Sequence, residues 1–374
     1  MRTFTAGDSH GPGLLGILEG LPAGLPLTAE DLDRDLARRQ RGFGRSERQR
    51  RQDRAEIWGG LHGGRTTGAP LGVRLGNPGE DLPPGELPPI RVPRPGHADL
   101  AGAMKYGLED VRPIWERASA RETAMRTALG AAARRLLGEA GISVVSRVRR
   151  IGAVEAASAA GEELTSPGQI LAVAAAAEAS DLRCDDPVAT EGMIREIEAA
   201  RRAGDSLGGV VEVLAAPLPT GLGSHVHWDR RLDGRLAQAA MSIPSVKGVE
   251  IGAGVEGAAL PGSRLHDGIF RGTTGTLRRT NRAGGLEGGI TNGMPLVLRL
   301  HFKPIPTLGE ALPSVDLHTG ELARPEEERA DVCAVPAGGV VAEAVVALVL
   351  ADALLERTGG DTLEMVLSAL ERSR

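Results

Sequence analysis

The fold class turns on the stretch Gly7-Asp8-Ser9-His10-Gly11-Pro12-Gly13-Leu14-Leu15-Gly16, near the start of the chain. Residues 11–16 match the dinucleotide-binding pattern Gly-x-Gly-x-x-Gly, which needs a helix that begins inside the turn and holds a pyrophosphate at its N-terminus. Further turn-forming residues follow at Gly20, Pro22 and Gly24, so no ordinary crossover helix fits here. The stretch therefore argues against a doubly wound dinucleotide-binding fold.

Residues 7–11 also match the Gly-x-Ser-x-Gly pattern of serine hydrolases. That motif lies between a central strand and a helix, and its acid and histidine partners come later in the chain. Here Pro12 and Gly13 follow at once, and the adjacent Asp8, Ser9 and His10 cannot form a triad among themselves. A hydrolase that uses Ser9 as its nucleophile stays an alternative, and covalent labelling of Ser9 by a fluorophosphonate would reveal it.

Elsewhere the strand and helix signals occur in clusters instead of alternating. Caps and helical spacing predict helices at about residues 28–40, 119–137, 166–179, 190–203, 232–241, 340–355 and 362–371. Alternating or β-branched runs predict strands at 2–6, 56–58, 71–75, 144–151, 209–215, 249–253 and 296–302. This order predicts an α+β fold with antiparallel sheets, and the absence of a linker predicts one domain, 1–374.

The bulk composition restricts the class of protein. The chain has 374 residues, 41% hydrophobic and 25% charged, as in soluble globular proteins. Cys184 and Cys333 lie far apart without a disulfide or metal motif, which favours a reducing cytoplasm and no metal site. Residues 340–355 are apolar but interrupted by Glu343 and Asp352, which predicts a buried core helix and not a membrane span.

A run of arginines is the first candidate functional feature. Eight arginines and only two acidic residues lie between Arg38 and Arg54. Guanidinium groups bind phosphate and carboxylate in a bidentate manner, so a glycine-rich segment of this kind can close over a small polyanion. The alternatives are a solvated basic loop or an RNA-binding arm with steeply salt-dependent affinity. The chain's eight Phe, Trp and Tyr residues and net charge of −5 disfavour nucleic-acid binding.

Four further segments combine charged groups with a constrained backbone. In Arg94-Pro95-Gly96-His97-Ala98-Asp99, a rigid turn carries a candidate acid or base, His97. In residues 116–123, a helix start combines Ser119 with two arginines and can bind an anion, or is simply a capped helix. Residues 281–293 are glycine-rich, so the backbone there bends tightly or lets a ligand approach closely. Arg329 and Asp331 are an ion pair or a catalytic pair.

Taken together, these segments resemble the motifs of one family, the chorismate synthases, in the family's order and over about residues 1–356. The matching segments are residues 6–11, 94–99, 118–123, 242–248, 284–293 and 329–331. Some positions depart from the family: Glu is more usual at Asp8, Asn-Ala at Pro244-Ser245, Asn at Arg282 and Pro at Val332. The Pro244-Ser245 departure falls on expected flavin contacts.

The resemblance implies a fold and a reaction. The fold would be long helices sandwiched between antiparallel four-stranded sheets, assembled as a homotetramer. The enzyme would be a carbon–oxygen lyase of the shikimate pathway of aromatic amino acid biosynthesis. It would convert 5-enolpyruvylshikimate 3-phosphate to chorismate and phosphate, an anti-1,4-elimination that needs reduced FMN without net redox change. NADPH or an external flavin reductase would supply the reductant.

The resemblance also implies roles for individual residues. His10 would protonate the leaving phosphate, His97 would sit near the N1 side of the flavin, and Asp331 would help to take up the C6 proton. The expected anion clamp is Arg39, Arg45, Arg48, Arg94, Arg121 and Arg329, of which Arg39 and Arg45 match NADPH contacts as well. The expected flavin contacts are Arg117, Ala118, Ser119, Pro244, Ser245, Gly288, Lys303, Pro304, Ile305, Pro306, Thr307 and Arg329.

Overall fold

The first sheet of the fold is built from the N-terminal part of the chain. In the computed structural model, which describes residues 1–45, 53–77, 87–157, 164–272, 275–325 and 331–372, this sheet has four antiparallel strands. Their spatial order is β1 (Arg2–Gly7), β2 (Gly13–Glu19), β6 (Leu71–Gly76) and β3 (Ala55–Gly59). The inward side chains of β2 and β6 are buried and alternate with more exposed ones, so this sheet has one core face.

The second sheet comes from the middle of the chain and is also antiparallel throughout. Its order is β10 (Val246–Ile251), β15 (Leu296–Phe302), β9 (Gly209–Ala216), β7 (Ser143–Ile151) and β8 (Val154–Glu155). The four-stranded sheet that the resemblance implied is therefore wrong for this sheet. The fifth strand, β8, has only two residues and pairs with the end of β7, which is too short a pattern to recognise in the sequence.

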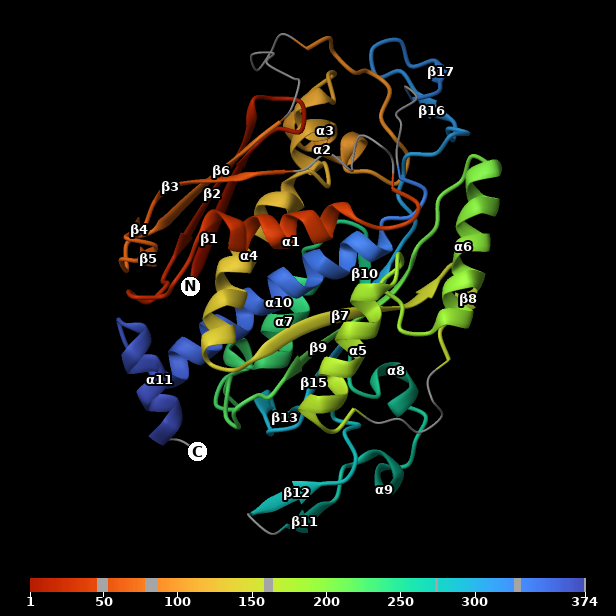
Figure 1. The fold of residues 1–374 in the computed structure, drawn as a ribbon. Coiled ribbons are helices and arrows are strands. Elements are labelled where there is room, and N and C mark those ends of the chain that lie inside the picture. Colours follow the sequence, from red (N-terminus) through yellow and green to blue (C-terminus); the bar gives the residue numbers. More distant parts are fainter. Residues whose placement is uncertain (46–52, 78–86, 158–163, 273–274, 326–330, 373–374) are drawn as a thin grey trace.

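Three long helices, α1 (Ala29–Gln40), α4 (Glu122–Glu139) and α10 (Val335–Thr358), cross the centre of the molecule (Figure 1). Helix α4 packs on β1, β2 and β6 of the first sheet, whereas α10 packs on β7 and β9 of the second. The two helices also pack on each other, and α1 contacts both. Antiparallel sheets with separate helices make this an α+β fold, as predicted.

The crossing of α4 and α10 depends on a glycine. A Cβ atom at Gly130 would lie 2.6 Å from the Cα of Ala344, which is closer than real Cβ atoms approach. The two helices therefore touch backbone to backbone at this point. Gly16 has the same function in β2, because a Cβ there would lie 2.6 Å from Met125 Cγ on α4. Small residues thus bring the first sheet, α4 and α10 into close contact.

The other helices arise mostly where capping signals predicted them. Thr28 and Asp31 form the capping box of α1, and Ser166 and Gln169 form that of α5. The remaining helices are α2 (Asp99–Tyr106), α3 (Arg112–Ala118), α5 (Pro167–Ala179), α6 (Pro187–Arg202), α7 (Leu232–Met241), α8 (Gly254–Gly257), α9 (Gly262–Leu265) and α11 (Leu363–Arg372), with a 3₁₀ turn at Trp228–Arg230. The short strands are β4 (Leu61–His62), β5 (Arg65–Thr66), β11 (Ile269–Arg271), β12 (Thr276–Arg278), β13 (Leu286–Glu287), β14 (Ile290–Thr291), β16 (Ser314–Val315) and β17 (Leu322–Ala323).

Helix α10 is long and apolar enough to cross a membrane by length and composition alone. However, 78% of its most apolar 18-residue window is buried inside the fold. The helix is also the only one in the described residues that meets the length and composition test. This burial is what the sequence predicted for residues 340–355, a core helix.

Helix α10 also carries a buried carboxylate, Glu343. Its oxygens accept hydrogen bonds from Arg38 at 2.7 Å, from Arg183 at 2.7 Å and from the Ser146 hydroxyl at 2.8 Å. Burial by itself would raise the pKa of Glu343, but Arg38, Arg134 and Arg183 outweigh it and lower the pKa to about 2. This ionic cluster ties α10 to α1, α4 and β7 in the interior.

Candidate active site

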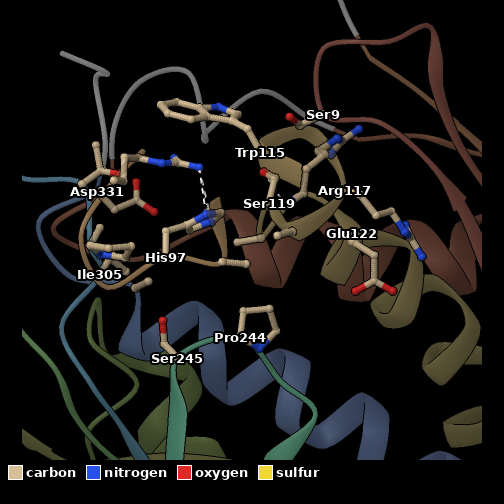
Figure 2. A pocket seen from close by; sticks show the side chains of 18 of the residues that line it. Ser9, His97, Trp115, Arg117, Ser119, Glu122, Pro244, Ser245, Ile305 and Asp331 are labelled. Atoms are coloured by element: carbon tan, nitrogen blue, oxygen red, sulfur yellow. Dashed lines mark hydrogen bonds between the residues drawn. The ribbon is translucent and has the colours of Figure 1, made fainter. Parts of the chain in front are cut away.

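The largest group of expected functional residues lines a cavity of about 630 Å³. Its walls come from the turn after β1, the C-terminal end of α1, the junction between α3 and α4, and the segments 94–98 and 303–307. Figure 2 shows Asp331 and His97 on one side, Ser9 and Arg117 on the other, and Pro244 and Ser245 across from Trp115. Segments more than 200 residues apart in the sequence thus meet in one place.

The cavity is strongly positive. Seven of its described lining residues are cationic, and three carry carboxylates. The cations are Arg39, Arg45, Arg94, Arg117, Arg121, Arg126 and Lys303, and the carboxylates are Asp53, Glu122 and Asp331. Such an excess of positive charge in a concave site attracts a small molecule that carries several negative charges.

Arg39 shows how crowded the positive charges are. Its guanidinium donates to the Thr123 hydroxyl at 2.9 Å and to the Ala120 carbonyl at 2.9 Å, both neutral groups. Burial, together with the charges of Arg45 and Arg121, lowers the pKa of Arg39 to about 9. Arg39 is still protonated at neutral pH, but its charge is destabilised. An anion in the cavity would relieve this repulsion.

Arg45 has hydrogen-bonding capacity that the described protein groups do not use. Its Nη1 forms an ion pair with Asp331 Oδ2, and both side chains are buried. Its Nε and Nη2 atoms are also buried, and neither has a hydrogen-bond partner in the described residues. Buried donors without partners are costly, so they indicate a site for an oxygen-rich ligand.

Arg121 and Arg94 differ from Arg45, because protein groups hold their donors. A single nitrogen of Arg121, Nη1, donates to both Asp53 carboxylate oxygens at 2.7 Å each, and its Nε donates to Asn77 Oδ1 at 2.8 Å. Arg94 donates to Asp99 Oδ2 at 3.0 Å, and its guanidinium carbon lies 3.2 Å from the Trp115 ring centroid. These two arginines contribute charge to the cavity wall while their orientation is fixed from behind.

His10 lies in the turn between β1 and β2 and is held by Glu116 of α3. The imidazole Nδ1 lies 3.0 Å from each Glu116 carboxylate oxygen. The backbone N–H of His10 and the Ser9 hydroxyl donate to the same carboxylate, at 2.8 and 2.7 Å. Burial raises the pKa of Glu116, but the hydrogen bonds from His10 and Ser9 outweigh it and lower the pKa to about 2. Glu116 is therefore ionised.

This arrangement does not favour the hydrolase alternative. In a catalytic triad the serine and the carboxylate lie on opposite nitrogens of the imidazole. Here the Ser9 hydroxyl and Glu116 both approach Nδ1 of His10. The chain from Gly7 to Glu19 also forms a turn and strand β2, not the strand, elbow and helix of a hydrolase.

His97 is the second histidine in the cavity, and it is tied to Asp99. Its Nδ1 pairs with Asp99 Oδ1, and Arg94 Nη2 lies 3.1 Å from the same nitrogen. Asp99 is fully buried; burial raises its pKa, but the hydrogen bonds from His97 and Arg94 outweigh this and lower it to about 2. The ring centroids of His97 and Trp115 are 6.5 Å apart. The segment 94–99 is thus a preformed unit that presents His97 to the cavity, as its sequence suggested.

Most of the expected flavin contacts line the same cavity. These are Arg117, Ala118, Ser119, Pro244, Ser245, Lys303, Ile305, Pro306 and Thr307. Pro304 is not among the lining residues. Gly288 lies away from the cavity, in the tight turn between β13 and β14, where its φ is +61°. Arg48 and Arg329 lie outside the described residues.

Ser245 stands out in the cavity wall because of its backbone. Its φ is +72°, in the left-handed region that only glycine adopts at low cost. Its carbonyl accepts a hydrogen bond from the backbone N–H of Lys303 at 2.9 Å, which joins the start of β10 to the end of β15. The Lys303 ammonium reaches the Gly96 carbonyl at 2.9 Å. Burial and the nearby Lys247 lower the pKa of Lys303.

The sequence did not identify the carboxylates that orient the site. Glu116 and Asp53 lie inside segments that were singled out for other residues, and Asn77 and Trp115 carried no motif signal. Periodicity offered one signal for Glu116, because it follows Arg112 by one helical turn and the two pair at 3.3 Å. The only signal for Asp53 was that it is one of two acidic residues within the arginine run.

Comparison with known proteins identifies the family of this chain. A family model described as chorismate synthase matches residues 1–355. The chain belongs to the chorismate synthase family. A chorismate synthase of Moorella thermoacetica is 54% identical and covers 100% of this chain and 98% of its own. One of Symbiobacterium thermophilum is 52% identical, over 98% of this chain and 97% of its own. A solved chorismate synthase structure superposes with a TM-score of 0.83 at 43% identity, covering 99% of this chain and 96% of its own. The resemblance seen in the motifs is thereby confirmed, together with a lyase as the class of enzyme.

Proposed function

We propose that this protein converts 5-enolpyruvylshikimate 3-phosphate to chorismate and phosphate, in the shikimate pathway of aromatic amino acid biosynthesis. The substrate carries a phosphate and two carboxylates, or about four negative charges at neutral pH. The observation that carries the proposal is the balance of seven cations against three carboxylates among the described lining residues, together with the Arg45 donors that find no partner among them. A concave cavity with this balance matches the charge of the substrate.

Three side chains divide the proton chemistry. His10, held by Glu116, is the group that delivers a proton to the departing phosphate. Asp331 is the carboxylate that helps to receive the proton lost from C6, and its pairing with Arg45 fixes its position. His97, which pairs with Asp99, lines the cavity and would lie near the N1 side of the flavin. Arg39, Arg45, Arg94 and Arg121, with Arg48 and Arg329 outside the described residues, hold the anionic groups.

The cavity also has room and chemistry for reduced FMN. Two observations support the fit: the cavity measures about 630 Å³, and Lys303 and Arg117 supply cations beside the neutral wall of residues 305–307. Ala118, Ser119, Pro244, Ser245 and residues 303–307 would hold the cofactor. When bound, reduced FMN would supply an electron transiently and so weaken the carbon–oxygen bond. NADPH, near Arg39 and Arg45, or an external flavin reductase would provide the reducing equivalents.

We further propose a cytoplasmic homotetramer whose subunits have the layered arrangement expected for the family. The contacts of α4 with the first sheet and of α10 with the second support long helices between two sheets. The two buried thiols, which form no disulfide, support a reducing compartment. Because Gly288 lies away from the cavity of its own chain, we keep it as a proposed flavin contact without a placement.

An anaerobic assay of phosphate release tests the proposed function. Phosphate should appear from the substrate when dithionite-reduced FMN is present, and should not appear with oxidised FMN. The His97→Ala and Asp331→Asn variants serve as active-site controls, and Glu109→Gln, an exposed substitution, serves as the surface control. Phosphate release that is independent of the flavin's redox state would contradict the proposal.

A further inference from the structure

Glu116 accepts more hydrogen bonds from the Ser9–His10 turn than a simple ion pair with His10 would supply. Its side chain is 6% exposed, and its two oxygens receive the Ser9 hydroxyl, the His10 backbone N–H and the His10 imidazole. From the other side of the turn, the Asn77 amide donates to the carbonyls of Asp8 and Gly11. The turn is therefore clamped between α3 and the end of β6.

This contact selects one form of the imidazole. A carboxylate oxygen 3.0 Å from Nδ1 accepts a hydrogen bond from a protonated Nδ1. Nδ1 therefore carries a proton in both the neutral and the charged ring, and the nitrogen that gains or loses a proton is Nε2. His10 lines the cavity, so this exchange takes place at the nitrogen that is turned away from Glu116.

The charges around His10 act in opposite directions. Arg112 of α3 lies 3.3 Å from Glu116, and its positive charge partly offsets the effect of the Glu116 carboxylate on His10. The cations that line the cavity disfavour a proton on His10. They reach the cavity from α1 and the loop after it (Arg39 and Arg45), from the 94–98 turn, from the α3–α4 region (Arg117, Arg121, Arg126) and from the end of β15 (Lys303). The acidic lining groups Asp53, Glu122 and Asp331 favour the proton, but each has an arginine partner of its own.

We propose that Glu116 is a positioning residue that keeps His10 protonated and directs its Nε2 proton toward the leaving phosphate. Without this carboxylate, an imidazole beside so many cations would be neutral at physiological pH and could not act as an acid. The role of His10 in this proposal rests on the proposed function. The state of the His10 ring does not, because it is a property of the resting protein.

The test compares Glu116→Gln with the wild type by NMR titration of the His10 ring. Glutamine keeps the shape and can still accept from Ser9 and from the His10 backbone, but it has no charge. The His10 resonance is assigned by its loss in His10→Gln. We expect the midpoint of the His10 titration to fall by about one to three pH units in Glu116→Gln. The Glu109→Gln variant is the matched control, because Glu109 faces His318 in an exposed pair far along the chain from His10.

Kinetics gives an independent readout. The upper limb of the pH profile of phosphate release should move to lower pH by the same amount as the NMR midpoint. Turnover of Glu116→Gln should thus fall about tenfold or more at neutral pH and recover as the pH is lowered, whereas a general loss of structure would not recover.

An unchanged His10 midpoint in Glu116→Gln would overturn the proposal. If that variant does not fold, the wild type decides: a His10 midpoint at or below the ordinary value of about 6.5 would also overturn it. If instead the midpoint moves but the wild type releases no phosphate, the proposed function fails and the assignment of Glu116 as the partner that charges His10 stands.

Discussion

Replacing Asp331 with asparagine should separate binding from turnover. Asp331 pairs with Arg45, whose other buried donors already have no partner in the described part of the chain. Asparagine keeps the size of the side chain but removes its charge. The cavity then holds one more uncompensated positive charge, and Arg45 is released to contact the substrate. The loss of the carboxylate has the opposite effect on the chemistry, because an amide cannot receive a proton.

The magnitudes follow from these two effects. A buried charge-assisted contact contributes about 1.5–3 kcal/mol. At about 1.4 kcal/mol per factor of ten, substrate affinity should rise about 10- to 150-fold. Loss of a proton acceptor should slow turnover by about 10² or more. We therefore expect Asp331→Asn to have a lower Kd for the substrate and a much lower kcat.

Calorimetry with FMN present measures the affinity, and anaerobic phosphate release at saturating substrate measures turnover. The same substitution is then made in the Arg45→Ala background. If Asp331 acts by receiving a proton, Asp331→Asn should still reduce turnover in the Arg45→Ala background. If Asp331 acts only by holding Arg45, the substitution should no longer change turnover in that background. Normal turnover in Asp331→Asn, or weaker binding together with slower turnover, would refute the reasoning and leave Asp331 as a structural partner of Arg45.

Three further outcomes are expected. Glu343→Gln should lower the free energy of unfolding, measured with urea and circular dichroism at pH 7, by about 3–5 kcal/mol, because it removes the fully buried carboxylate that Arg38 and Arg183 share. Glu178→Gln, which alters a partly exposed member of the same cluster, should cost no more than about 1 kcal/mol. Since the pKa of Glu343 falls from 4.5 to about 2 in the fold, its stabilisation is complete above pH 4.5 and is lost as the pH falls toward 2, so acid titration of stability should show a smaller loss over that interval in the variant. Burial raises the pKa of Cys333 to about 12 and also raises that of Cys184, so both thiols should react with Ellman's reagent only after unfolding, and rapid reaction of the native protein would contradict the core described above. His10→Ala should bind FMN and substrate but release phosphate about 10²- to 10⁴-fold more slowly, and near-normal turnover would make His10 structural.

The helices and most long strands were predictable because their signals are local. The Thr28 cap, the Ser166-Pro167 start and the apolar alternation of residues 296–302 each act within a few positions. Strand β2 was missed because Gly13, Gly16 and Gly20 resemble turn residues. At least one of these glycines is required by tertiary packing, because Gly16 makes room for Met125 on a helix more than 100 residues later. Helices α2 and α3 were also missed, because with 8 and 7 residues they are too short to show a clear helical period.

The site was predictable as a set of residues but not as an arrangement. The motifs identified the arginines and histidines, and most of those described line one cavity. The sequence could not show that Arg121 donates to Asp53 while two Arg45 donors have no partner in the described residues, because that depends on which long-range partners come within 3 Å. Nor could it show that Gly288 lies away from the cavity, because a glycine-rich turn has no side chain to indicate a direction.

The contact between Gly130 and Ala344 has a consequence for how the cavity keeps its width. Gly130 is nine residues beyond Arg121 on α4, about 13 Å along the helix axis, and Ala344 is ten residues beyond Ala334 on α10, about 15 Å. The N-terminal ends of α4 and α10 thus both reach the cavity, and the two helices are held together at one crossing point, Gly130 and Ala344. A methyl group added at Gly130 would push the two helices apart at the crossing. This change would move Arg121 away from Asp331 without contacting any ligand. In a mutational scan, substitutions at this crossing should therefore abolish catalysis although every binding residue is unchanged.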